Sequence, residues 1–334
     1  MIFVTGGTGL VGMHAVAAFL RRGERLRLLV REGSDRDPLL ALLRDQGLSQ
    51  EVMWVEGDLF DTTFLVEAME GCTAVFHAAA MVSFHAADRD MLYKVNVEGT
   101  ANLVNAALEN QIQTFYYISS VAALGRGGQG SVTEEETEWK DGPELTNYAR
   151  SKHLAEREVW RGHEEGLRVV VVNPGVIIGR GDFSRSSAAL YLNIDKGLPF
   201  FPAGSNGFVA VEDVVDACFY LSDNGRFNER YLLVGEHQSF QHLFNKIAES
   251  IDVKPPQKSA PRWLLNLAWR AAWVWEKISG KRAVITKEAV QNTDQDYRYS
   301  NEKMCATGFT FRPLDAVIKS AGAAYRAKYK SAAQ

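Results

Sequence analysis

The sequence predicts an α/β protein with a doubly wound parallel sheet, which carries helices on both faces, and with a smaller lobe in the C-terminal part. Three observations support this fold. A short apolar run at the N-terminus ends in glycines at positions 6, 9 and 12 and leads directly into an apolar periodic segment. Short apolar runs then alternate with amphipathic segments as far as Pro174. With 46% hydrophobic and 23% charged residues, the 334-residue chain has the composition of a globular protein with a large core.

The expected elements follow one another in the order that a parallel sheet requires. We expect helices at about 9–22, 62–70, 88–110 and 146–165. The strand-like runs lie at 25–30, 52–55, 74–77, 114–119 and 167–173. Strands that alternate with helices predict parallel pairing, and such sheets bind ligands at the carboxyl ends of their strands.

The opening turn fits the diphosphate of a dinucleotide. Gly6 would allow the sharp reversal after the strand, Gly9 would let the backbone approach the diphosphate, and Gly12 would let the helix lie against the sheet. Free N–H groups at the start of the helix would bind the anion. We therefore expect a Rossmann sheet whose first turn contacts a cofactor through Gly6, Thr8, Gly9, Leu10, Val11 and Gly12.

The pattern becomes irregular after Pro174, which indicates two parts. We assign residues 1–179 and about 206–235 to an NAD(P)-binding Rossmann domain. The strand-like run at 230–235 and the apolar periodicity at 210–222 are the reason for including the second range. Residues at about 180–205 and 236–334 form the expected substrate-binding lobe, which is smaller and mainly helical.

Charge and cysteine content exclude several classes of protein. The net charge of −4 and a pI near 6 give no overall basic field for nucleic acid or an anionic membrane. Cys72, Cys218 and Cys305 are far apart, so we expect free thiols in a reducing compartment rather than a disulfide or a metal site. The chain enters the glycine turn at once, which leaves no room for a signal peptide, and a cytoplasmic protein is expected.

A tryptophan-rich segment at 263–275 is the most membrane-like part of the sequence. It is too short to span a bilayer and contains Arg270. Aromatic residues that pack on one helix face against the rest of the protein are the default interpretation. A lid over the substrate, a dimer face and a membrane-surface helix are the alternatives.

The second and third strands are expected to end beside the adenosine half of the cofactor. An acidic residue after the second strand typically binds the ribose 2′-hydroxyl. Here Arg31 and Glu32 follow that strand, and Arg36 comes next. A guanidinium pairs well with a 2′-phosphate, which favours NADP over NAD, whereas Glu32 favours the opposite. Asp58 could accept a hydrogen bond from the adenine amino group, and small residues after the fourth strand would let the cofactor pass: Ala78, Ala79 and Ala80.

Tyr148 and Lys152 are four residues apart, so they lie on one face of a helix expected from about Thr146. A phenol has a pKa of ~10. A neighbouring ammonium lowers this pKa toward values at which the group can transfer a proton at neutral pH. Ser120 ends the fifth strand and could hold a substrate oxygen together with Tyr148. Asn96 either holds a water that connects Lys152 to solvent or binds a backbone carbonyl at a helix distortion.

Together these motifs occur in a recognisable order. The matching runs lie at 5–12, 58–59, 96–100, 119–120, 173–175 and 208–214, with Tyr148 and Lys152 between them. Over about residues 1–220 the chain resembles the extended short-chain dehydrogenase/reductases of the NAD-dependent epimerase/dehydratase superfamily. The resemblance implies that Tyr148 transfers the proton, that Lys152 lowers its pKa and binds the nicotinamide ribose, that Ser120 binds the substrate oxygen and that Asn96 is a relay. It also implies cofactor contacts from Leu59, Pro174, Gly175 and Val176.

One departure and two similarities favour one branch of this family. Members of the family that resemble sugar-nucleotide dehydratases carry a Ser/Thr-Asp-Glu run after the fifth strand, which supplies the acid and the base of water elimination. This chain has Ser120-Val121-Ala122 there and lacks both groups. The run at 173–179 and the apolar loop after the fourth strand are similar to those of dihydroflavonol reductases, cinnamoyl-CoA reductases and 3β-hydroxysteroid dehydrogenases. The loop provides the expected substrate contacts, which are Val82, Ser83 and Phe84.

We therefore expect an NAD(P)-dependent oxidoreductase, with NADP favoured, that acts on the carbonyl or alcohol of an apolar or aromatic small molecule. A sugar-nucleotide epimerase with tightly bound NAD and a catalytically silent dinucleotide-binding sensor are the alternatives. Neither a nucleic-acid partner, nor a membrane span, nor a metal is expected. The helices at 88–110 and 146–165 could form a homodimer interface.

Overall fold

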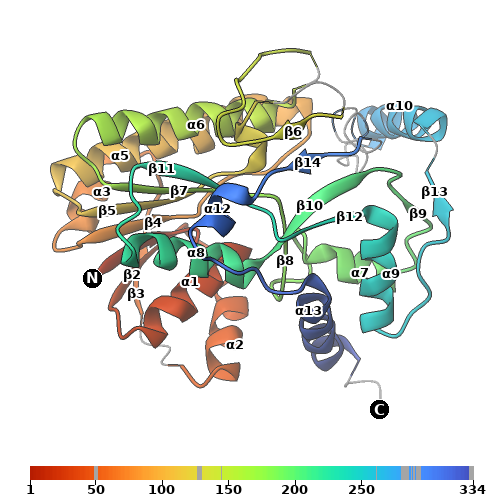
Figure 1. The fold of residues 1–334 in the computed structure, drawn as a ribbon, viewed down its shortest axis with the longest axis horizontal. Helices are drawn as coiled ribbons and strands as arrows, with labels where there is room; N and C mark the ends of the chain where they lie inside the picture. The colour runs from red at the N-terminus through yellow and green to blue at the C-terminus, as the bar shows by residue number, and fades with distance from the viewer. Residues whose placement is uncertain are drawn as a thin grey trace.

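The computed structural model describes residues 1–48, 52–125, 130–143, 145–260, 262–279, 286, 288, 290 and 295–330. Its centre is a seven-stranded parallel sheet in the order β11-β7-β5-β4-β1-β2-β3 (Figure 1). The strands are β1 (Ile2–Thr5), β2 (Leu26–Val30), β3 (Met53–Glu56), β4 (Ala74–His77), β5 (Thr114–Ile118), β7 (Val169–Pro174) and β11 (Glu229–Leu233). The strand order reverses between β1 and β4, which is where such sheets bind ligands.

Helices cover both faces of this sheet, as the alternating pattern predicts (Figure 1). One face carries α1 (Leu10–Arg21), α2 (Asp37–Asp45) and α8 (Val211–Asp223). The other face carries α3 (Thr62–Met69), α5 (Gly99–Glu109) and α6 (Asn147–Glu164). The doubly wound Rossmann fold is thereby confirmed.

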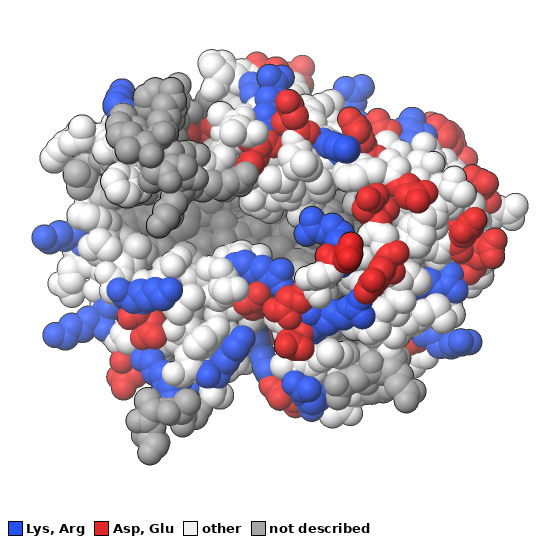
Figure 2. Space-filling model, turned by 180° about the vertical axis from the view of Figure 1, so that it is seen from behind, with Lys and Arg blue, Asp and Glu red and all other residues white. Residues whose placement is uncertain are grey.

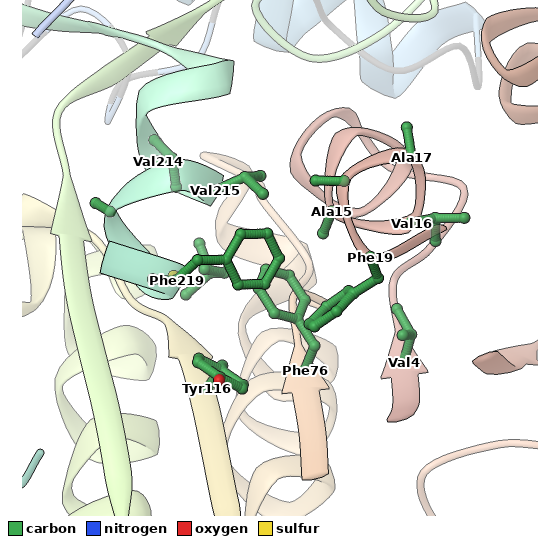
Figure 3. Close-up of a cluster of buried hydrophobic side chains, with 14 of the residues drawn as sticks. Val4, Ala15, Val16, Ala17, Phe19, Phe76, Tyr116, Val214, Val215 and Phe219 are labelled. Atoms are coloured by element: carbon green, nitrogen blue, oxygen red, sulfur yellow. The ribbon is translucent and has the colours of Figure 1, made fainter. Parts of the chain in front are cut away.

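The central strands are mainly apolar because their side chains enter two different cores. In β1, Val4 belongs to the core under α1 and α8, whereas Phe3 belongs to the core under α3, α5 and α6. On the first side, the ring of Phe19 lies 4.7 Å from that of Phe219 and 5.7 Å from that of Phe76 (Figure 3). These edge-to-face contacts fix α1, and with it the glycine turn that precedes it, against the sheet.

The helix expected at 88–110 is interrupted. A 3-10 turn (Ala86–Asp88) leads into α4 (Arg89–Tyr93), a π-helical turn follows at Lys94–Glu98, and α5 begins at Gly99. The buried Asn96 lies within the π-helical turn. Single π-turns inside α-helices frequently mark functional sites, because they aim a side chain that a regular helix would direct elsewhere.

The smaller lobe is mainly helical but is built on a second sheet. This sheet has the order β12-β10-β8, from β8 (Val176–Ile178), β10 (Ser205–Ala210) and β12 (Glu236–Ser239). Three helices share one apolar core with it: α7 (Ala189–Asp195), α9 (Phe240–Ser250) and α13 (Leu314–Tyr329). Shorter elements are β6 (Val132–Thr133), β9 (Phe200–Phe201), β13 (Lys258–Ser259), β14 (Arg298–Tyr299) and α12 (Glu302–Ala306).

Sheet membership differs in one respect from the division made on the sequence. β11 and α8 lie with the large sheet as expected, but β8 and β10, within the ranges assigned to the Rossmann part, belong to the second sheet. The chain crosses between the sheets at Gly175, the single residue between β7 and β8. A Cβ at this position would overlap the carbonyl oxygen of Gly207, so the two sheets meet there at backbone contact.

The surface carries charges of both signs. On the face shown in Figure 2, Lys and Arg are interspersed with Asp and Glu. Cys72 and Cys218 are buried and Cys305 is exposed, and all three are free thiols. No helix in the described ranges is long and apolar enough to cross a membrane.

Helix α10 (Arg262–Ser279) contains the tryptophan-rich segment and lies at the outer edge of the smaller lobe (Figure 1). The default interpretation, that its aromatic residues pack against the rest of the protein, is wrong for part of the helix. The side chains of Trp263, Leu267 and Trp275 are 68%, 59% and 62% exposed. Spacings of four and eight residues put all three on one face of the helix, which is largely exposed.

Candidate active site

The glycine turn after β1 has the shape that a diphosphate site requires. Gly6 has a φ of +72°, and a Cβ there would lie 2.5 Å from the backbone nitrogen of Ala79. A Cβ on Gly12 would overlap the carbonyl oxygen of Gly6. The Gly9 N–H donates to that same carbonyl oxygen at 2.9 Å. Helix α1, which begins after Gly9, has neither a side-chain cap nor an acidic residue in its first turn, so its positive end suits an anion.

The residues expected around the adenosine half of the cofactor differ in how many contacts they already make within the protein. Arg31 is exposed directly after β2, whereas the guanidinium of Arg36 pairs with Glu56 and lies 4.7 Å from the ring centre of Trp54. The Asp58 carboxylate accepts hydrogen bonds from the backbone N–H groups of two following residues, at 2.6 and 3.1 Å. Leu59 is buried in the core under α3 and α5. These contacts give Asp58 and Leu59 structural roles in addition to the cofactor contacts predicted for them.

Helix α6 presents the predicted tyrosine and lysine. The hydroxyl of Thr146 caps the helix by accepting from the Ala149 N–H at 3.0 Å, and the helix begins at Asn147, close to the expected start. Lys152, 2% exposed, donates from Nζ to the hydroxyl of Tyr117 at 3.0 Å and to the carbonyl of Ile118 at 2.9 Å. The lysine is thereby fixed against the end of β5.

The pKa values of this pair depart from the expectation made on spacing. Burial raises the pKa of Tyr148, and a hydrogen bond with the Ser120 side chain opposes that shift. Burial also lowers the pKa of Lys152 to about 7, against the raising effect of Glu156. The expected lowering of the tyrosine pKa is therefore absent here, because the loss of water around the phenol outweighs the hydrogen bond with Ser120.

Ser120 combines two roles. Its hydroxyl caps a 3-10 turn (Val121–Ala123) by accepting from the Ala122 N–H at 3.1 Å. It also lines, with Tyr148, a cavity of about 270 Å³ at the carboxyl ends of β5 and β7. Gly175 and Val176 belong to the lining as well, next to the buried Pro174. The structure thus brings the predicted serine, tyrosine and nicotinamide-side residues to one place.

Aromatic side chains dominate the cavity. Phe84, from the loop after β4, lies 6.0 Å from the ring of Tyr148 in an edge-to-face arrangement. Phe240, Tyr297 and Tyr299 line the cavity from the smaller lobe. The remaining lining residues that the structure describes are small or uncharged: Val121, Ala122, Gly125, Thr133, Thr146 and Asn206.

Of the loop residues predicted to contact substrate, only Phe84 is among the residues described as lining the cavity. The side chain of Val82 is 62% exposed. Ser83 is buried and donates to the carboxylate of Asp88 at 2.7 Å, which fixes the loop. Ser83 therefore has a structural role in the loop, and the substrate contacts of Val82 and Ser83 stay a prediction.

Asn96 fastens the same loop to α6. Its Oδ1 accepts from the Met81 N–H at 2.7 Å, and its Nδ2 donates to the Met81 carbonyl at 3.0 Å and to Ser151 Oγ at 2.9 Å. This is the second of the two interpretations made on the sequence, a backbone partner at a helix distortion. The relay role stays a prediction.

His77, the last residue of β4, is a packed histidine. It forms hydrogen bonds with the hydroxyls of Thr5 at 2.6 Å and Thr100 at 2.9 Å, and burial lowers its pKa to about 3. The ring is therefore neutral at physiological pH and holds β1, β4 and α5 together.

Sequence reasoning missed Glu156, which lies one helical turn beyond Lys152 and is 3% exposed. Its carboxylate accepts from Ser119 Oγ at 2.5 Å, Asn173 Nδ2 at 2.8 Å and Trp160 Nε1 at 3.1 Å. Arg230 Nη1 of β11 lies 3.3 Å away. Glu156 thus joins the ends of β5 and β7, next to Ser120 and Pro174. The signal in the sequence was the repeated four-residue spacing at positions 148, 152 and 156.

Sequence reasoning also missed the aromatic residues of the smaller lobe. Tyr297 and Tyr299 are two residues apart, which places them on one face of an extended segment. Their rings stack at 6.4 Å, and the ring of His237 stacks on Tyr299 at 6.1 Å. The alternation was visible in the sequence, but β14 pairs with β6, which is more than 160 residues distant along the chain.

Comparisons with known proteins agree with this geometry. The sequence profile of the NAD dependent epimerase/dehydratase family matches residues 2–234. A protein of Synechocystis sp., provisionally named dihydroflavonol 4-reductase, is 31% identical over 310 residues, which cover 90% of this chain and 87% of that protein. Sterol demethylase protein B of Methylococcus capsulatus is 34% identical over 267 residues, which cover 79% and 78%. The crystal structure of gox2253 is 31% identical, with a TM-score of 0.81 and 99% of both chains covered.

Proposed function

This chain belongs to the NAD dependent epimerase/dehydratase family, and we propose that it is a dihydroflavonol-reductase-like oxidoreductase, which interconverts a carbonyl and an alcohol on an apolar or aromatic small molecule. The cavity carries this proposal, because Ser120 and Tyr148 share it with aromatic side chains of both lobes. None of its lining residues in the described ranges is charged. A sugar nucleotide, with its phosphates, would find no cationic partner among them.

The residues of the glycine turn fit a dinucleotide cofactor. Gly6, Gly9 and Gly12, together with the uncapped start of α1, would hold the diphosphate, and Lys152 would hold the nicotinamide ribose. A nicotinamide cofactor bound there would supply or accept the hydride. The protein's own part is to orient the substrate oxygen and to move a proton.

Tyr148 is the proposed proton donor in the reducing direction. Because burial raises its pKa, the phenol keeps its proton at neutral pH, which is the state that can protonate a carbonyl oxygen. Ser120 would donate a second hydrogen bond to that oxygen. The two hydroxyls together would stabilise the negative charge that develops on it, in a site lined by aromatic rings.

Lys152 is proposed to return the proton to Tyr148. With a pKa of about 7, its ammonium exchanges protons near neutral pH. Its contacts with Tyr117 and Ile118 hold the group on the face of α6 that also carries the tyrosine. The buried Glu156 would favour the charged form of the lysine.

We propose NADP as the preferred cofactor, on the strength of Arg31. It is exposed at the end of β2, where a 2′-phosphate would lie, and its guanidinium could pair with that phosphate. Arg36 contributes less, because Glu56 and Trp54 already hold it.

The direct test is turnover of nicotinamide with a panel of aromatic and aliphatic ketones and aldehydes, each with NADPH and with NADH. We expect net oxidation of NADPH with aromatic or polycyclic carbonyls. The family match favours one competing function, a sugar-nucleotide epimerase that uses the same tyrosine. Conversion of a UDP-sugar without net cofactor consumption, together with retained NAD, would favour the epimerase. Cofactor binding without turnover of any substrate would favour a silent sensor.

A further inference from the structure

Helix α10 has an apolar face whose side chains are largely exposed. Trp263, Leu267 and Trp275 are each more than half exposed, and Ala271 lies between them and is exposed as well. At 3.6 residues per turn, these four positions occupy an arc of roughly 120°. An apolar stripe of this width normally faces a core, yet here its side chains are largely exposed.

The segment around this helix is also the most basic part of the chain. Residues 254–282 contain seven Lys and Arg and one acidic residue, a net charge of +6 in a chain whose total is −4. Lys254 and Lys258 are exposed just before the helix, and Arg270 is exposed beside the apolar arc. The low overall charge had argued against an anionic membrane as a partner, but the total hides this local concentration.

Tryptophan content is equally uneven. Four of the seven tryptophans of the chain lie within residues 263–275. Tryptophan prefers the boundary between water and hydrocarbon, where its ring is buried and its N–H remains accessible to polar groups. In the described part of the helix, the Trp269 N–H is bonded to Asn266 Oδ1 at 3.2 Å, and the Arg270 guanidinium lies over the Trp269 ring at 4.8 Å.

We propose that α10 docks on the surface of an anionic lipid bilayer, with Trp263, Leu267 and Trp275 in the interfacial region and the neighbouring lysines and arginines on the lipid headgroups. An amphipathic helix with tryptophan and leucine on one face and basic residues around it has the chemistry of a helix that lies in the plane of a membrane. A protein partner fits less well, because protein interfaces are depleted in lysine and four lysines lie in this segment. The helix lies on the surface and does not span the bilayer.

The test is flotation of the full chain with vesicles of phosphatidylcholine and phosphatidylserine, compared with vesicles of phosphatidylcholine alone. Wild-type protein is expected to float with the mixed vesicles at low salt, to float much less at high salt, and to stay unbound with pure phosphatidylcholine. The variant W263S/L267S/W275S is expected to lose at least ten-fold in vesicle partitioning. Its matched control is M53S/M91S, two residues that are also about half exposed but lie on β3 and α4.

A second variant tests the charges. K254E/K258E/R270E is expected to abolish the preference for phosphatidylserine, while circular dichroism and the Tm stay close to wild type because all three side chains are exposed. Failure of the wild type to bind mixed vesicles would overturn the proposal. Unchanged vesicle binding by the folded variant W263S/L267S/W275S would overturn it too. The same holds if the wild type binds no vesicles but forms an oligomer, and this variant is a monomer. None of these readouts depends on catalysis.

Discussion

The two walls of the cavity are built in different ways. The wall with Ser120 and Tyr148 comes from the large sheet and α6, and the buried carboxylate of Glu156 fastens it by hydrogen bonds to the ends of two strands. The opposite wall, with Tyr297 and Tyr299, comes from short segments of the smaller lobe that are held by stacked rings. A rigid polar wall suits chemistry that must be positioned closely, whereas a stacked aromatic wall can be altered without moving the reacting groups.

The largest effect is expected on the rigid wall. Tyr148→Phe removes the proposed proton donor but keeps the ring against Phe84, so kcat should fall by ~10²–10⁴-fold, the usual contribution of a general acid. Cofactor affinity, measured by fluorescence titration, should stay within a factor of about two. The matched control is Tyr299→Phe, which removes a hydroxyl from the opposite wall and should leave kcat nearly unchanged. Equal losses in both variants would remove the distinction between the walls.

Glu156→Gln tests how the rigid wall is held. Loss of the charge should lower the free energy of unfolding by ~1–3 kcal/mol, because buried donors lose their ionic acceptor. Since Glu156 raises the pKa of Lys152, the variant should lower that pKa below about 7. Lys152 would then lose its proton at lower pH, and the alkaline limb of the kcat profile should move to lower pH.

The control for this variant is Glu158→Gln on the same helix. Glu158 is partly exposed and pairs with Arg161, so its loss should shift neither the pH profile nor, beyond a few tenths of a kcal/mol, the stability. A purely structural role for Glu156 would lower the Tm and leave the pH profile in place.

Tyr297→Ala probes the aromatic wall. We expect KM for an aromatic carbonyl to rise by up to about tenfold, from the loss of a ring contact of ~0.5–1.5 kcal/mol, with little change in kcat. KM for a small aliphatic ketone should change much less. A fall in kcat that exceeds the rise in KM would show that this wall also positions the reacting carbonyl.

The smallest effect is expected outside both walls. Arg31→Ala should weaken the binding of NADPH by about fivefold, the scale of an exposed charge contact of ~1 kcal/mol. The affinity for NADH should not change. Arg36→Ala is the matched comparison and should do less, since Glu56 already holds that guanidinium. Isothermal titration with both cofactors distinguishes these results, and an equal loss for NADH would remove the argument for NADP.

The contrast between the walls also explains what could be predicted from the sequence. The glycine turn, the alternating elements and the Tyr148–Lys152 spacing lie within continuous segments, where local geometry decides which side chains share a face. The residues of the rigid wall could therefore be predicted from the sequence, apart from Glu156. The burial of Glu156 depends on strands that come from other parts of the chain. The raised pKa of Tyr148 was missed for the same reason, since spacing along a helix gives direction but not burial.

The residues of the aromatic wall could not be predicted from the sequence in this way. Tyr299 reaches the cavity because β14 pairs with β6 from a distant part of the chain, and a strand of two residues carries almost no periodic signal. The loop after β4 shows the intermediate case. Its apolar character pointed to Phe84, which lines the cavity, but local pattern could not show that Ser83 bonds to Asp88 or that Val82 is left in solvent.

Gly175 sets a limit on how this molecule can change. The backbone there links the sheet of the proposed cofactor site to the sheet of the smaller lobe, and it is also part of the cavity lining. The carbonyl oxygen of Gly207 occupies the position that a side chain at residue 175 would take, so a larger residue does not fit there. New substrate preferences are therefore expected to arise from exchange of other lining side chains, such as Phe84, Phe240 and Tyr297, while position 175 remains glycine.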